Sequence, residues 1–162
     1  MRALLALTVF GGGIAQVTLA PALRIGVVTP DIPLIIVVLL ALRRGAETGC
    51  LAGAVVGLMQ DVAGGGLLGV QALTKALVGF VIGAAAPRLS VTQPLVQVPG
   101  LVLLSVAEAL ARFALLKVFH FPVAFGELMT YVVLPQALYN GFIGAVLALG
   151  LAWVEAYRRR VS

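Results

Sequence analysis

Apolar runs long enough to cross a bilayer, joined by short polar connections, restrict the fold of this chain more than any other feature. A transmembrane helix needs about 20 mostly apolar residues, and Ala3–Leu23 supplies 21 between Arg2 and Arg24. Of the 162 residues, 62% are hydrophobic and 10% charged, whereas soluble domains have about 25% charged residues. The sequence therefore predicts an all-α integral membrane protein that forms a single domain over residues 1–162.

The apolar runs predict six crossings, of which the second is short or broken. Its run, Ile32–Leu42, has 11 residues, or about 16 Å of helix against a hydrocarbon core of about 30 Å. Prolines flank Asp31 at its start, so we expect the freed backbone groups to be buried in protein or to line a wet cavity. The expected crossings are 3–23, 26–42, 46–62, 67–86, 95–119 and 128–153.

The basic residues predict that both termini are cytoplasmic. Lys and Arg concentrate in cytoplasmic loops, and this arrangement places seven of them inside and two, Arg24 and Lys117, outside. The first run exceeds the apolar core of about 7 to 15 residues found in secretory signals, so we expect a retained helix rather than a cleaved signal. The seven inside residues are Arg2, Arg43, Arg44, Arg88, Arg158, Arg159 and Arg160.

Small residues form one face of the expected third helix. Gly45, Gly49, Gly53 and Gly57 are each four residues apart, and Asp61 is next in the series. Residues at this spacing share a helix face, and a row of glycines lets another helix approach closely. The approaching helix could belong to this chain or to a partner, and the pattern alone leaves both open.

Ionisable residues within the expected crossings are costly in lipid, so we expect them to be paired inside the bundle. Glu108 and Arg112 are at i and i+4 of the fifth helix, in the favourable order for an ion pair. On the fourth helix Lys75 leans back towards the preceding turn, where we expect it to bridge Asp61. Further polar residues share faces with these groups: Ser105 on the fifth helix, Gln71 and Thr74 on the fourth, and Gln136, Tyr139 and Asn140 on the sixth.

These polar faces have two interpretations. They could face one another, fix helix register and contact a partner protein, or they could line a pocket for a small polar ligand or a proton path. The sequence offers neither a nucleophile with a base in reach nor clustered basic residues on a solvated face, which argues against an enzyme and against nucleic-acid binding. With one Cys and one His far apart, we expect no metal site and no cofactor.

The stretch Pro30–Gly83 resembles the core of the MreD family of rod shape-determining membrane proteins. Tyr139-Asn140 also resembles a polar spot in the last helix of that family. The matching elements are Pro30-Asp31, Arg43-Arg44-Gly45, the glycine row ending in Gln60-Asp61, the glycine turn with Leu68-Gly69, and the segment from Ala72 to Gly79.

This resemblance implies a non-catalytic component of the elongasome in the bacterial inner membrane, where lateral peptidoglycan is built. It implies MreC as direct partner, and MreB, the RodA glycosyltransferase and its penicillin-binding transpeptidase as indirect partners. It also implies a fold similar to the substrate-binding subunits of energy-coupling-factor transporters, which keeps a small-molecule-binding subunit of a transporter as the alternative. We expect the opening near Asp31 and the row Gly49, Gly53 and Gly57 to receive the helix of MreC.

Overall fold

The structure is a computed structural model that describes residues 2–26, 28–65, 67–88, 94–120, 126 and 129–161. Within these ranges the chain is helical, with an isolated bridge between Ile25 and Val28 as its only strand-like pairing. A 3-10 turn, Ala86–Arg88, follows α4, and a π-helical turn, Met129–Val133, precedes α7. The helices are α1 Arg2–Thr18, α2 Ile32–Arg44, α3 Ala46–Gly64, α4 Val70–Ala85, α5 Pro94–Val118 and α7 Leu134–Val161.

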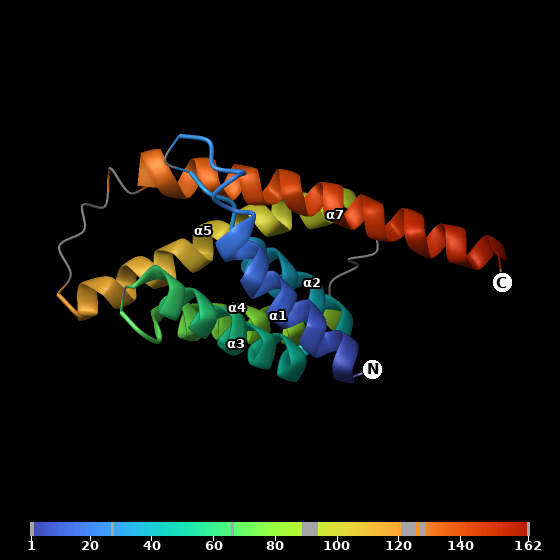
Figure 1. Cartoon of the computed structure of the whole chain (residues 1–162), viewed down its shortest axis with the longest axis horizontal. Coiled ribbons are helices and arrows are strands. Elements are labelled where there is room, and N and C mark those ends of the chain that lie inside the picture. The colour runs from blue at the N-terminus through green and yellow to red at the C-terminus, as the bar shows by residue number, and fades with distance from the viewer. Residues whose placement is uncertain are drawn as a thin grey trace.

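The helices run back and forth between two ends of an elongated bundle (Figure 1). Both termini lie at one end, which we call the terminal end, together with the junction between α2 and α3. The opposite end, which we call the loop end, holds the segment before α2 and the turn between α3 and α4. Helices α3, α4 and α5 agree with the expected ones within a few residues. By contrast, α1 ends at Thr18, α2 begins only at Ile32, and α7 begins at Leu134 and continues to Val161.

Helix α2 is the centre of the core, because it packs against α1, α3, α4, α5 and α7. Its side chains Leu34, Ile35, Val37, Val38 and Ala41 are each at most 1% exposed. The surrounding helices turn apolar side chains outward instead, which is the arrangement expected of a bundle in lipid. Examples are Leu7 and Phe10 on α1, Leu77 and Phe80 on α4, and Leu138 and Phe142 on α7.

The row of glycines on α3 faces α4, and these two helices form the most extensively packed pair. A Cβ atom added at Gly49 would meet the backbone of Gly79, and one added at Gly53 would meet the backbone of Lys75. At Gly57 it would meet the backbone of Gln71 and Ala72. The expectation that this row receives a partner helix is therefore wrong, because a helix of the same chain already covers it.

The lengths of the helices show which of the expected crossings could span a bilayer. By length and hydropathy, one helical stretch in the described ranges, Met129–Leu147, is sufficient to cross a bilayer. Leu5–Thr18 and Val70–Ala85 are apolar but shorter, and α2 has 13 residues, about 20 Å of helix. The all-α fold is confirmed, whereas six full crossings stay a prediction.

Candidate functional site

The carboxylate of Asp31 is positioned by the start of α2. Asp31 is the N-cap residue, and its Oδ1 accepts a hydrogen bond from the backbone nitrogen of Leu34 at 3.1 Å. Such a bond satisfies one of the free N–H groups at a helix start. A proline in the first turn favours the same boundary, because its missing N–H is not needed there. The cap leaves Oδ2 of Asp31 directed at the interior of the bundle.

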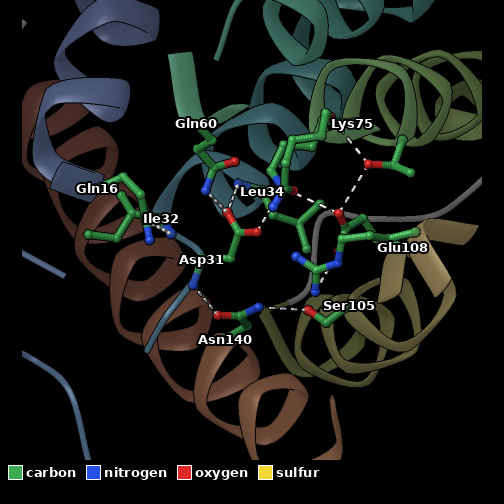
Figure 2. A network of polar contacts seen from close by, with 12 residues as sticks. Gln16, Asp31, Ile32, Leu34, Gln60, Lys75, Ser105, Glu108 and Asn140 are labelled. Carbon is green, nitrogen blue, oxygen red and sulfur yellow. Dashed lines mark hydrogen bonds and ion pairs between the residues drawn. The ribbon is translucent and has the colours of Figure 1, made fainter. Parts of the chain in front are cut away.

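Lys75 of α4 is the hub of a buried polar cluster (Figure 2). Its side chain is fully buried, and its Nζ lies 2.8 Å from Oδ2 of Asp31 and 3.3 Å from Oε1 of Glu108. The same amine donates to Oε1 of Gln71 at 2.8 Å. A lysine ammonium has three N–H donors, so each of them has an acceptor in this cluster.

Glu108 of α5 connects the hub to a second basic residue. Its Oε1 also accepts a hydrogen bond from Oγ1 of Thr74 at 3.2 Å, and its Oε2 lies 4.0 Å from a guanidinium nitrogen of Arg112. The expected pairing of Glu108 with Arg112 is thus present, although Lys75 is the nearer cation. The two carboxylates and the two cations balance in charge, which makes burial of Asp31, Lys75 and Glu108 beside the partly exposed Arg112 tolerable.

One face of α7 supplies hydrogen bonds to the non-helical segment before α2. Tyr139 donates to the carbonyl of Leu23 and Gln136 to the carbonyl of Thr29, each at 2.9 Å. Oδ1 of Asn140 accepts from the backbone nitrogen of Asp31 at 2.8 Å. The backbone freed by the short α2 is therefore bonded to protein side chains, as a membrane interior requires.

Two further contacts complete the cluster. Asn140 donates from Nδ2 to Oγ of Ser105 at 3.1 Å, which joins α7 to α5. The backbone nitrogen of Ile32 donates to Oε1 of Gln16 at 3.0 Å, which joins α2 to α1. The polar faces of α4, α5 and α7 thus meet one another, as the first of the two interpretations predicts (Figure 2).

The expected bridge between Asp61 and Lys75 is wrong. Asp61 accepts hydrogen bonds from the backbone nitrogens of Gly69 at 2.8 Å, Gln71 at 3.0 Å and Ala72 at 3.2 Å. Its carboxylate therefore lies at the N-terminus of α4, where free N–H groups and the helix dipole favour a negative charge. Lys75 is one turn further along and turns to Asp31 instead.

Gln16 and Gln60 also belong to the cluster, although they are not among the site residues predicted from the sequence. Gln60 donates from Nε2 to Oδ1 of Asp31 at 3.3 Å. Its Oε1 is buried without a hydrogen-bond partner in the described part of the chain. An amide inside an otherwise apolar run was the available signal, since buried polar groups need partners.

The chemistry of this arrangement is ion pairing and hydrogen bonding among its own members. Asp31, Lys75, Glu108 and Asn140 are each at most 3% exposed, and Arg112 is the most accessible charged member, with 22% of its side chain exposed. Within the described ranges, no group of three or more His, Cys, Asp or Glu residues is arranged to hold a metal ion. Every ionised group of the cluster has an opposite charge within 4.0 Å.

Comparison with known proteins gives one family. The family model described as rod shape-determining protein MreD matches residues 1–161. Nothing matches among curated proteins or among solved structures. The expected likeness to subunits of energy-coupling-factor transporters therefore stays a prediction.

Proposed function

The chain belongs to the MreD family of rod shape-determining membrane proteins, and on that premise we propose that it is a non-catalytic scaffold of the elongasome. Its role in this proposal is to bind the single-span protein MreC in the inner membrane. Through MreC it would connect MreB filaments with RodA and its penicillin-binding transpeptidase, and so help organise peptidoglycan synthesis. Membership of the family supports the role in cell shape, and the partners follow from the family resemblance.

The observation that carries the scaffold proposal is the self-contained charge cluster. Lys75, Asp31 and Glu108 are buried and paired with one another, so their charges stabilise the bundle rather than reach outward. The outward faces carry large apolar side chains instead, among them Leu7 on α1 and Leu138 on α7. Such faces suit packing against lipid or against the transmembrane helix of a partner.

A topology with both termini in the cytoplasm fits this proposal. Arg43 and Arg44, at the end of α2, are exposed at the terminal end, which also holds both chain termini. Arg24 lies in the segment before α2 and Lys117 near the end of α5, both towards the loop end. The excess of basic residues at the terminal end supports a cytoplasmic location for that end. The six helices then cross, or partly cross, the inner membrane.

Co-purification from native membranes tests the scaffold role. The tagged protein is solubilised in mild detergent from a rod-shaped bacterium that depends on it, and mass spectrometry identifies the proteins and small molecules retained. We expect MreC in stoichiometric amounts, together with cell-wall synthases. A transporter ATPase with a stoichiometric small molecule would overturn the proposal in favour of the transport alternative.

Substitutions at exposed positions test which outer face of the bundle contacts MreC. Single tryptophan substitutions at Ile14 on α1, Leu77 on α4 and Leu138 on α7, each more than half exposed, leave the core untouched and enlarge one outer face at a time. The three variants are matched controls for one another, because each places the same side chain on a different helix. We expect loss of MreC from one of them with unchanged thermal stability of all three.

A further inference from the structure

The bundle consists of two parts that pack more extensively within themselves than against each other. Helices α1, α2, α3 and α4 form one part, which we call the body, and α5 with α7 forms the other, which we call the α5–α7 pair. Across the boundary α5 packs mainly against α4, and the contacts of α2 with α5 and with α7 are sparse compared with those inside either part. Figure 1 shows α7 along one side of the body and α5 running obliquely to it, with the C-terminal end of α5 separated from α7.

The contacts between the two parts differ in kind along the bundle. Leu101 of α5 packs into an apolar cluster with Leu34, Val38 and Ile82 of the body, and a Cβ at Gly144 of α7 would meet both Leu101 and Ile35. Glu108 lies seven residues beyond Leu101, about 10 Å nearer the loop end. There the contacts are polar, from Glu108 to Lys75 and Thr74 and from Asn140 to Asp31.

The ionised groups of the polar cluster divide evenly between the two parts. The body holds Lys75 and Asp31 at 2.8 Å, and the α5–α7 pair holds Glu108 and Arg112 at 4.0 Å. Among the described residues, Lys75 to Glu108, at 3.3 Å, is the ion pair that crosses between them. Breaking a buried ion pair is costly when a charge is left unpaired, but separation along this boundary leaves each part with its own cation and anion.

We propose that the α5–α7 pair pivots on the apolar contact around Leu101, and that the ion pair of Lys75 with Glu108 is a latch that holds the loop end closed. Opening breaks the latch and the hydrogen bonds beside it, those of Thr74 with Glu108 and of Asp31 with Asn140. It also breaks the bonds that Gln136 and Tyr139 of α7 donate to the segment before α2. Thr74 keeps its bond to the carbonyl of Val70, whereas the backbone nitrogen of Asp31 loses Asn140, which makes the closed state the resting state. The π-helical turn Met129–Val133, at the loop end of α7, is a type of irregularity that often marks functional sites.

Distance measurements between pairs of spin labels on the protein in lipid nanodiscs test this latch. Labels at Val62 and Leu134, both exposed, report on the loop end, and labels at Leu51 and Leu149, also exposed, report on the terminal end. Cys50 is replaced by Ala in all samples. The double variant Glu108→Gln and Arg112→Gln removes the latch and keeps each part neutral.

In this double variant we expect the distance between Val62 and Leu134 to gain a second, longer population. The distance between Leu51 and Leu149 should keep a single population. Lys117→Gln removes an exposed charge from the same helix and should change neither distance. Glu108→Asp keeps the charge and shortens the side chain, so it should give a smaller long-distance population than the double variant. It replaces the double variant in the test if that variant folds poorly.

Two results would overturn the latch. One is a distribution between Val62 and Leu134 that is the same in wild type, in Glu108→Asp and in the double variant, which would mean that the two parts form one rigid unit. The other is lengthening of both distances together, which would mean that the α5–α7 pair detaches instead of pivoting. Neither result depends on whether MreC is the partner, so the latch and the scaffold role fail separately.

Discussion

The amine of Lys75 lies 2.8 Å from the carboxylate of Asp31. This contact joins the middle of the bundle to the start of α2, the shortest α-helix in the described part of the chain. Asp31 caps α2 with one carboxylate oxygen and pairs with Lys75 through the other. The side chain of Asp31 thereby fixes the relative positions of α2, the segment before α2, and α4. A buried charge pair of this kind is sensitive to loss of one member.

Replacing Lys75 with Met should destabilise the protein strongly, because Asp31 and Glu108 would remain buried while losing their nearest cation. Loss of one partner of a buried pair costs about 3–5 kcal/mol. Thermal unfolding in detergent measures the effect. Arg112→Met is the matched control, since Arg112 is 22% exposed and 4.0 Å from Glu108, and its melting temperature should fall less. Equal effects of the two substitutions would contradict the assignment of Lys75 as hub.

Replacing Asp61 with Ala should cost about 1–2 kcal/mol, the value of a lost helix cap. The reason is that three backbone nitrogens at the start of α4 lose their acceptor. Asp61 does not pair with Lys75, although both bind Gln71, Asp61 at the backbone nitrogen and Lys75 at the side chain. The effect of Asp61→Ala should therefore nearly add to that of Lys75→Met in the double variant. A coupling well above about 0.5 kcal/mol between the two sites would instead favour the bridge that the structure argues against.

Replacing Gly53 with Ala should disrupt the contact of α3 with α4, because the new methyl group would meet the backbone of Lys75 and Ala76. Overpacking typically costs about 1–3 kcal/mol. Gly11→Ala on α1 is the control, since nothing lies within 4 Å of the added atom. We expect a lower melting temperature for Gly53→Ala alone. If Gly53→Ala keeps its stability but loses a partner, the glycine row serves association after all.

Replacing Asn140 with Leu should loosen the segment before α2. The backbone nitrogen of Asp31 would lose its acceptor, and Ser105 would lose its donor. Hydrogen–deuterium exchange should become faster at the amide of Asp31. Leu138→Ala, on an exposed face of the same helix, should leave that exchange rate unchanged. Unchanged exchange in Asn140→Leu would show that the segment is held by other contacts.

Much of the fold follows from patterns that are local in sequence. The apolar runs locate α3 and α4 within a few residues, and the prolines beside Asp31 locate the start of α2. The glycine spacing shows that a helix packs closely on α3, but not which helix. That α4 takes this place depends on the tight turn between them, where Asp61 caps the helix that follows.

The members of the polar cluster were largely foreseeable, because ionisable groups in lipid need partners. The pairing of Glu108 with Arg112 also follows from their spacing on one helix, but the partner of Lys75 does not follow from the sequence. Lys75 has Asp61 nearby in sequence and Asp31 far away, and the choice between them is made by the free N–H groups at the start of α4, which take Asp61. Gln16 and Gln60 were not predicted as members of the cluster, because a single amide in an apolar run forms no periodic pattern.

Cell shape with the charge cluster neutralised tests whether the cluster has a structural role only. The variant combines Asp31→Asn, Lys75→Met, Glu108→Gln and Arg112→Met, since replacing a buried ion-pair network as a whole is often neutral for stability. It is produced in rod-shaped cells depleted of the native protein, after its melting temperature has been measured. If the cluster is structural, the variant folds and the cells remain rods. A variant that is as stable as wild type but leaves the cells round would show the opposite, that the charges act on something outside the bundle.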